Sequence, residues 1–247
     1  MSRSNPTVNT PNPCTRWFDW NGGEGGLRYY DKQTKEVVDL EPKMTFILLD
    51  QTSVIKGWHD ASDSGIYSNE VRDTRVSPFL VKAFKGGKLA EGLYASIRDR
   101  VLAVGGHFTA NCYIAFKNGT GLALGSLQFK GAALRSWMEF AKNSRKELYN
   151  KAISIDGFEE GKKGKIVFRT PKFFISEISE ATNQQAINLD RELQEYLESY
   201  FKRTQTDQVQ AAPPADAPQS DAPEAVDEDP PEEPEASPIS EDDDVPF

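Results

Sequence analysis

The sequence predicts a mainly β protein with added helices, an α+β class, followed by an acidic C-terminal tail. Three observations lead to this prediction. Short runs of aromatic and β-branched residues, separated by glycine-containing turns, recur through most of the chain, as in sheet proteins. Apolar residues recur in three places at the three- and four-residue spacing of amphipathic helices. The end of the 247-residue chain has the composition of a segment that does not fold alone.

Composition divides the chain into a lead, one body and a tail. We expect residues 1–15 to form a flexible lead, residues 16–203 to form one domain and residues 204–247 to form the tail. The tail holds fourteen Asp or Glu residues, no Lys or Arg, nine of the fifteen prolines and a single aromatic residue, Phe247. Such a segment cannot bury enough apolar surface to offset its ordering entropy, so we expect it to be disordered.

The two signs of charge lie on separate parts of the chain. The whole protein has a formal net charge of −9, from 29 basic and 38 acidic residues. Because fourteen of the acidic residues are in the tail, the rest of the chain keeps 29 basic against 24 acidic side chains, a net charge of +5. A body with excess positive charge can attract nucleic acid, and the negative charge of the whole chain would argue against this only if it were spread evenly along the sequence.

Cysteine count and hydropathy favour a cytoplasmic protein. Cys14 and Cys112 are too few, and too far from other ligand residues, to predict a disulfide framework or a zinc site. No apolar run reaches the ~18 residues of a membrane span, and residues 1–13 lack the apolar region of a signal peptide. We expect no cofactor, no metal and no membrane contact.

The first half of the body predicts a series of strands. Residues 16–31 combine aromatic side chains with a glycine-rich loop, which indicates two short strands joined by that loop. A long apolar stretch over residues 44–58, with a bend near residues 51–53, predicts a further strand region. Residues 65–67 and 79–84 predict two more strands.

A helix is predicted between the glycine pairs at residues 86–87 and 105–106. The apolar residues between them have the spacing of one helix face: Leu89, Leu93, Ile97, Val101 and Val104. Residues 107–117 and 121–129 then predict a strand pair joined by an Asn-Gly-Thr-Gly turn.

The second half of the body adds two helices and further strands. Residues 132–149 and 183–202 carry apolar stripes at helical spacing, and residues 153–155, 165–169 and 173–178 predict strands between them. The central order is three strands, a helix and two strands. This is the order of an OB-fold, a Greek-key β-barrel that binds oligonucleotides across its strand face, so we expect an OB-fold with added helices.

Binding single-stranded DNA without reading its sequence requires cations that follow the phosphates and exposed rings on which bases stack. Alternation along the predicted strands brings such pairs to one face: Lys56 with Trp58, Lys82 with Phe84, and Tyr113 with Lys117. The same alternation predicts that Phe116 points into the core. A core role is the alternative for each ring, because strand aromatics are commonly buried.

The remaining candidates for DNA binding flank these strands or lie beside glycines: Trp17, Trp20, Tyr29, Tyr67, Arg72, Arg75, Lys85, Lys88, Lys162 and Lys163. The glycines at residues 22–26 would let a ligand approach the backbone closely, so the rings beside them, including Tyr30, fit a ligand role or a core role. Trp137 and Phe168 have apolar companions at core spacing, and we expect both inside.

The tail ends in a sequence that a purely solubilising segment does not need. Its last six residues are Asp242, Asp243, Asp244, Val245, Pro246 and Phe247. This ending predicts a short peptide ligand: the terminal ring enters an apolar pocket of a partner, its α-carboxylate meets an Arg or Lys, and the aspartates contact a basic rim.

These six residues resemble the tip of bacterial single-stranded-DNA-binding proteins, which recruit replication and repair enzymes through it. The body resembles a different family through its Gly-Ile-Tyr-Ser-Asn-Glu-Val segment at residues 65–71 and its glycine-bracketed helix. This segment and this helix resemble those of replicative single-stranded-DNA-binding proteins of tailed bacteriophages, which join an OB-fold to an acidic tail. The resemblance implies protection of single-stranded DNA in phage replication, recombination and repair in the host cytoplasm, and recruitment of a polymerase, helicase or primase.

Two other classes of function stay open. One is an interaction protein whose acidic tail mimics DNA, and a mobility shift with oligothymidine tests for it because a mimic leaves the oligonucleotide free. The other is a Mg²⁺-dependent nuclease, which would degrade labelled DNA. Neither His59 nor His107 lies in a catalytic or metal-binding motif, and no phosphate-binding loop is present, so we predict no catalytic residue.

The tail predicts competition with DNA within one molecule. A flexible segment of 44 residues spans about 35 Å, which lets it reach its own body, where its charges act at a high effective concentration. We predict that a chain ending at Arg203 binds oligothymidine more tightly at low salt and no longer recruits replication proteins. Filter binding in dilute buffer measures the affinity, and an unchanged value would contradict the competition.

Overall fold

The computed structural model describes residues 10–211, with side chains described for residues 10–204. The chain divides into a unit over Met1–Tyr200 and a second unit over Phe201–Phe247, and the fold described below is that of the first unit. The predicted partner-binding tip at residues 242–247 lies outside the described residues.

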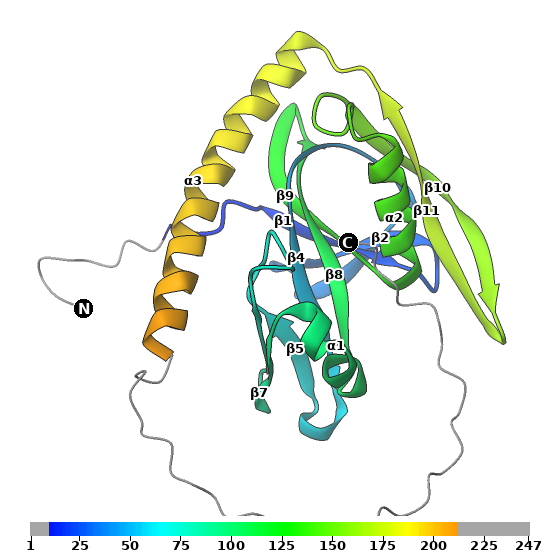
Figure 1. Cartoon of the computed structure of the whole chain (residues 1–247). Coiled ribbons are helices and arrows are strands. Elements are labelled where there is room, and N and C mark those ends of the chain that lie inside the picture. The colour runs from blue at the N-terminus through cyan, green and yellow to red at the C-terminus, as the bar shows by residue number, and fades with distance from the viewer. Residues whose placement is uncertain (1–9, 212–247) are drawn as a thin grey trace, which may run out of the picture. The chain divides into compact units, whose positions relative to one another are not determined.

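The described residues form eleven strands and three α-helices, which confirms a mainly β protein of the α+β class (Figure 1). The strands are β1 (Arg16–Asn21), β2 (Gly26–Asp31), β3 (Glu36–Leu40), β4 (Lys43–His59), β5 (Ser64–Ser68), β6 (Phe79–Ala83), β7 (Gly87–Gly92), β8 (Gly106–Asn118), β9 (Gly121–Lys130), β10 (Ala152–Lys163) and β11 (Ile166–Ser176). The helices are α1 (Tyr94–Ala103), α2 (Gly131–Asn143) and α3 (Glu180–Ala211), with a short 3-10 helix, η1 (Asp60–Ser62).

All the strands belong to one sheet, in the order β3-β2-β1-β9-β8-β4-β5-β6-β7, with β10 joined to β4 and β11 to β10. Only β1 and β9 pair in parallel. β4, β5 and β6 form a meander, and β8 returns after β7 and α1 to lie beside β4, which is the spatial order of a Greek key. Closure of these strands into an OB-fold barrel stays a prediction, because β9 pairs with β1 at its other edge in this strand path.

β4 is the strand around which the sheet is built. Its 17 residues pair with β8 along most of their length, and a bulge shifts the register between Leu48 and Asp50. On its other edge, β10 pairs with the beginning of β4 and β5 pairs with its end. At about 3.3 Å per residue the strand is roughly 50 Å long, so its two ends contribute to different parts of the molecule.

One face of the sheet, which we call the inner face, carries the main core. Trp137 of α2 is fully buried, stacks on Phe129 of β9 with ring centroids 5.3 Å apart, and donates from Nε1 to Oε1 of Gln51 at 2.9 Å. Phe116 is also buried, so the predicted core positions of Trp137 and Phe116 are confirmed. Phe168, expected inside, is half-buried on β11.

The opposite face, which we call the outer face, is covered by α3 over part of its area. Ala186 of α3 packs there against Ile47, Ala115 and Ala152, which neighbour one another across β4, β8 and β10. Figure 1 shows α3 and α2 on opposite sides of these strands. The outer face is therefore buried near the beginning of β4 and open near its end.

Several predicted boundaries differ from those of the structure. Residues 87–92 form β7 where the beginning of a helix was predicted, and Leu89 of that strand packs on the same cluster as Ile97 of α1, which explains the apparent helical spacing. β3 was not predicted, and the last predicted strands belong to one long hairpin, β10–β11.

The last helix also differs from its prediction. α3 extends to Ala211, beyond the predicted end at Lys202. A truncation that removes the tail and spares this helix therefore ends at Ala211 and not at Arg203. None of the described helices combines the length and the apolar character needed to cross a membrane.

Candidate nucleic-acid interface

Register brings three exposed aromatic rings together on the open part of the outer face. Trp58 on β4 lies opposite Gly65 on β5, and the N–H of Phe84 donates to the carbonyl of Gly65 at 3.1 Å. Tyr67 and Phe84 have ring centroids 4.7 Å apart. The exposed fractions are 54% for Trp58, 38% for Tyr67 and 75% for Phe84. We call Trp58, Tyr67 and Phe84 the aromatic patch.

Gly65 matters for this arrangement because it has no side chain. A Cβ atom at that position would lie 3.5 Å from the ring of Phe84, so the ring rests directly over the glycine backbone. The consequence is that the Phe84 ring lies beside the strand position that carries Trp58.

Lysine side chains border the aromatic patch. Lys82 lies opposite Tyr67 and also opposite Lys88 of β7. Lys88 is exposed and forms an ion pair with Glu91, whereas exposed Lys85 reaches the carbonyl of Asp63 at 3.5 Å. The structure therefore combines aromatic rings and cations on adjacent strands, as the sequence predicts for these lysines.

A pocket of about 180 Å³ opens on the same face, between the aromatic patch and α3. It is lined by residues from the lead, from β1, β4, β5, β8 and β9, from the segment after β5, and from α3: Asn12, Trp17, Val54, Lys56, Tyr67, Ser68, Glu70, Asn111, Tyr113, Ser126, Gln128 and Tyr200. We call it the outer-face pocket. Tyr67 belongs both to its lining and to the aromatic patch, so the two features are continuous.

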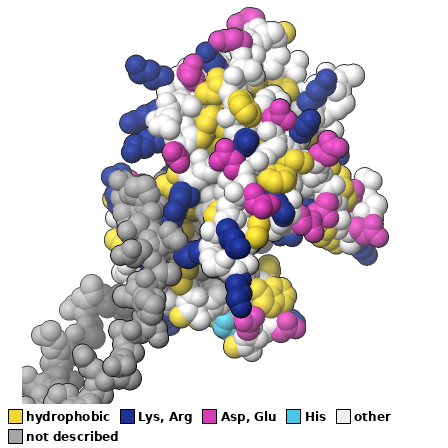
Figure 2. All heavy atoms as spheres, turned by 90° about the vertical axis from the view of Figure 1, so that its right-hand side faces the viewer, with side chains coloured by type: hydrophobic (Ala, Val, Ile, Leu, Met, Phe, Trp, Pro, Cys, Tyr) yellow, Lys and Arg dark blue, Asp and Glu magenta, His cyan; other side chains and the backbone are white. Residues whose placement is uncertain are grey.

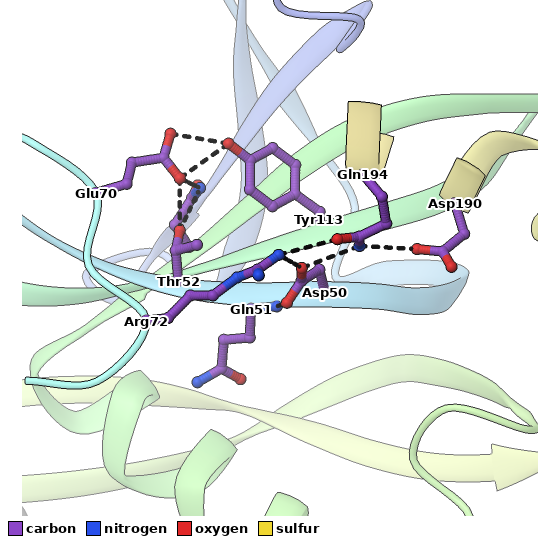
Figure 3. A network of polar contacts seen from close by, with 9 residues as sticks. Asp50, Gln51, Thr52, Glu70, Arg72, Tyr113, Asp190 and Gln194 are labelled. Atoms are coloured by element: carbon purple, nitrogen blue, oxygen red, sulfur yellow. Dashed lines mark hydrogen bonds and ion pairs between the residues drawn. The ribbon is translucent and has the colours of Figure 1, made fainter. Parts of the chain in front are cut away.

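The carboxylate of Glu70 organises one side of the outer-face pocket (Figure 3). It accepts hydrogen bonds from the Tyr113 hydroxyl at 2.8 and 2.9 Å, from the Thr52 hydroxyl at 2.7 Å and from the Asn111 amide at 3.4 Å. The backbone N–H of Glu70 donates to the hydroxyl of Tyr200 on α3 at 2.8 Å. One side chain thus joins β4, β8 and the segment after β5, and its backbone joins α3.

The floor of the pocket continues the network across β8 and β9. Oδ1 of Asn111 accepts from the Ser126 hydroxyl at 2.6 Å and from Nε2 of Gln128 at 3.0 Å. Oε1 of Gln128 in turn accepts from the ammonium group of Lys56 at 2.6 Å. Asn111, Ser126 and Gln128 are all buried, and every one of these polar side chains has a partner.

A second network fixes the position of α3 beside the pocket (Figure 3). Nη2 of Arg72 donates to Oδ2 of Asp50 at 2.6 Å and to Oε1 of Gln194 at 2.9 Å. Nε2 of Gln194 donates to Asp50 and to Asp190, at 3.1 Å in each case. Because Asp50 lies at the bulge of β4, the irregularity in that strand is the point at which the helix is attached.

Burial perturbs the ionisable groups around the pocket. It lowers the pKa of Lys56, as does Lys130, while Asp19 and Glu70 act in the opposite direction. Although the Lys56 side chain as a whole is exposed, its ammonium group reaches back over the sheet to Gln128.

Three weak acids beside the pocket have raised pKa values. Burial, followed by the charge of Glu70, raises the pKa of the Cys14 thiol to about 12, raises the pKa of Tyr196 to about 12 and raises the pKa of Tyr113 further. All three groups are therefore uncharged in the native protein at neutral pH.

The predicted exposure of Tyr113 is wrong. Alternation correctly separates Tyr113 from Phe116, but Tyr113 is only 1% exposed because Glu70 and α3 cover the outer face at that point. Its predicted companion Lys117 is exposed at the end of β8, where it lines a different pocket, beside the beginning of α3.

Most of the aromatic residues around the glycine loop at residues 22–26 pack against other parts of the protein. Trp20 is 3% exposed and donates from Nε1 to the carbonyl of Arg169 on β11 at 2.8 Å, so this candidate for DNA binding, which the sequence left open between a ligand role and a core role, is a core residue. A Cβ atom on Gly25 would lie 2.6 Å from both Arg169 and Phe158. The glycines therefore admit the β10–β11 hairpin at the place where a ligand was expected.

Other rings near this loop differ in their surroundings. Tyr29 is half-buried and packs edge-on against Phe18. Half-buried Trp17 lies on the outer face, under the ammonium group of Lys32 at 4.3 Å from its ring centroid. Tyr30, which the sequence left between a core role and a ligand role, is 56% exposed.

The remaining cationic candidates are not part of the aromatic patch. Arg75 is paired with Asp73, and Arg72 belongs to the network that attaches α3. Lys162 and Lys163 lie on β10, which pairs only with the beginning of β4 and with β11. On the face shown in Figure 2, basic and acidic side chains are interspersed, with hydrophobic side chains exposed between them.

Sequence reasoning missed the polar floor of the pocket. Asn111, Ser126 and Gln128 interrupt otherwise apolar strands at alternate positions, so they share one face. This alternation was the available signal, because polar residues at regular positions in a buried strand need partners on the same face. Glu70 has no comparable signal, since it lies in an irregular segment between β5 and β6.

In comparisons with known proteins, no family model, no curated protein and no solved structure matches this chain.

The raised pKa values predict a loss of stability in alkaline solution. Unfolding exposes Cys14, Tyr113 and Tyr196, which then lose their protons near the ordinary values of 9.0 for the thiol and 10.0 for the phenols. Above pH 9 the unfolded state therefore binds fewer protons than the native state, and the free energy of unfolding falls by about 1.4 kcal/mol per pH unit for each such group. Urea unfolding between pH 8 and 11 measures this decline. In Tyr113→Phe the slope above pH 10 should be smaller by one proton, and an unchanged slope would contradict the burial of this hydroxyl.

Proposed function

We propose that this protein binds single-stranded DNA without sequence specificity, and that the strand lies across the open part of the outer face from β4 to β6. The observation that supports the proposal is the aromatic patch with its bordering lysines on adjacent strands. Rings accept bases by stacking, whichever base is present, and lysines accept phosphates. A surface with both groups at neighbouring positions meets the requirements of sequence-independent binding.

The exposure of these rings is the physical reason to assign them a ligand. Burying a Trp, Tyr or Phe ring stabilises a folded protein by a few kcal/mol, and the buried clusters of this protein hold many such rings. Trp58 and Phe84 forgo that gain although the sheet provides a core on its other face. Adjacent exposed rings of this size are typical of a binding surface.

The strand order supports an OB-fold for the proposed binding body. If β4, β5 and β6 are the first three strands of the Greek key, then Tyr67 and Lys82 lie on the second and third strands. Oligonucleotides bind OB-folds across those two strands and the loops beside them. Trp58 lies at the end of the first strand, directly before the loop that contains η1.

The proposed cellular role rests on the resemblances of the tail tip and of the body, through residues 65–71 and the glycine-bracketed helix. We propose that the protein protects single-stranded DNA during phage replication and recombination in the host cytoplasm, without a catalytic activity or a cofactor. The acidic tip with its terminal Phe247 then recruits a polymerase, helicase or primase through a basic pocket of that partner. Pull-down of host replication proteins by the full chain, compared with a chain ending at Ala211, tests this role.

Removing single rings tests the proposed surface. In Trp58→Ala or Phe84→Ala, loss of one stacking platform should weaken oligothymidine binding by about 1–3 kcal/mol, roughly 5- to 150-fold. Fluorescence anisotropy with a labelled oligothymidine measures the affinity. Phe174→Ala is the matched control, because Phe174 is 53% exposed on β11 and lies outside the proposed surface. Equal effects of the three substitutions would contradict the assignment.

Removing two lysines tests the phosphate contacts. In the double variant Lys82→Met and Lys85→Met, the salt dependence of binding should become shallower, with a slope of log K against log salt smaller by about 1.4, or ~0.7 per phosphate contact. The control is Lys142→Met with Lys146→Met, at two exposed lysines at and just beyond the end of α2. If the control changes the slope as much as the test variant, DNA does not bind at β6 in the way proposed.

A further inference from the structure

We propose that the outer-face pocket receives one unpaired base of the bound strand, and that its side chains favour a base that offers oxygen acceptors, thymine or guanine, over cytosine or adenine. This inference rests on the proposed function. It goes beyond that function because the aromatic patch alone gives no preference between bases.

The outer-face pocket is continuous with the aromatic patch. Tyr67 lines the pocket, and its ring lies 4.7 Å from that of Phe84. Lys56 lies on β4, the strand next to that of Tyr67, and on the same face of the sheet. A base that follows those stacked on the patch can therefore turn into the pocket while its ring stays against Tyr67.

A negative charge on one side of the pocket favours a base over a phosphate. The Glu70 carboxylate forms one side of it and remains an acceptor for Tyr113, Thr52 and Asn111. An anionic group at this place repels phosphate. The base, which is uncharged, is the part of a nucleotide that fits here, whereas the phosphates stay at the lysines outside.

The polar side chains on the floor of the pocket keep some hydrogen-bonding capacity for a ligand. Asn111 uses its amide hydrogens on Thr52 and Glu70 and its oxygen on Ser126 and Gln128. Gln128 uses its oxygen on Lys56 and one amide hydrogen on Asn111. Among the described contacts of Lys56 and Gln128, two ammonium hydrogens and one amide hydrogen have no acceptor. Donors therefore predominate on these two side chains, because the acceptor capacity left among their described contacts is the second lone pair of the Gln128 oxygen.

Donors of this kind discriminate between bases. At the position where thymine presents O4 and guanine presents O6, cytosine and adenine present an amino group. A lysine ammonium group paired with O6 and N7 of guanine is a common base contact, and an amino group placed against the same donors finds no acceptor. The preference should be modest, because the pocket contacts a single base of the strand.

Competition between two pyrimidine oligomers tests the inference. Unlabelled oligo-dT and oligo-dC of equal length compete for the full-length protein against labelled oligo-dT, so purine stacking does not enter the comparison. We expect the native protein to bind oligo-dT about fivefold or more tightly than oligo-dC. In Lys56→Met, which keeps the length of the side chain and removes its donors, the ratio should fall close to one.

Lys85→Met is the matched control. It removes the same charge from a residue that does not line the pocket, so it should weaken both oligomers equally and leave their ratio unchanged. A native ratio near one, or a native ratio retained in Lys56→Met, overturns the inference while complexes with both oligomers still form. Failure to bind either oligomer would instead overturn the proposed function.

Free dTMP distinguishes a base of the strand from a free nucleotide. Because Glu70 repels phosphate and a single nucleotide in the pocket reaches only Tyr67 of the aromatic patch, dTMP should not displace labelled oligo-dT at concentrations at which unlabelled oligo-dT does. Displacement by dTMP at those concentrations would overturn the inference and indicate a mononucleotide site.

Discussion

The outer face depends on the hydrogen bonds that the Glu70 carboxylate accepts. Without this acceptor the Tyr113 hydroxyl, the Thr52 hydroxyl and one amide hydrogen of Asn111 would lose their shared partner, and burying such groups unpaired costs about 1–3 kcal/mol for each. The same residue bonds through its backbone to Tyr200 of α3. A single side chain in an irregular segment therefore holds the strands and the helix in the positions that leave a pocket between them.

Alternation along strands could be predicted from the sequence, but exposure could not. Lys56 with Trp58 and Lys82 with Phe84 share a face as the pattern indicates, and the rings of both pairs are exposed. The same rule places Tyr113 on that face, yet α3 and Glu70 bury it. The difference lies in long-range packing: α3 covers the sheet where small side chains such as Ala115 and Ala152 allow a close approach. A strand pattern contains no information on which part of a face a distant helix will cover.

The glycine loop between β1 and β2 also shows that local sequence does not predict long-range contacts. Glycines do indicate a close approach, and one occurs there, but the approaching group is the β10–β11 hairpin: the N–H of Arg169 donates to the carbonyl of Gly22 at 2.8 Å. The local sequence specifies that space is available and cannot specify the occupant, which lies almost 150 residues away in the chain. The boundary between β7 and α1 was missed for a related reason, since Leu89 and Ile97 contribute to one core from two different elements.

The outer face has a covered part and an open part, and this division determines where the DNA strand would lie in the proposed complex. Near the beginning of β4 the face is apolar and covered by α3, so it contributes stability. Near the end of β4 it is open, with rings and lysines that have no comparable cover. The pocket lies at the border, where each buried polar side chain of the floor has a partner, and where Glu70 and Lys56 place opposite charges on the lining. A strand crossing this border would keep its phosphates over the lysines and its bases over the rings, and the pocket would present the donors of Lys56 and Gln128 to the edge of one base.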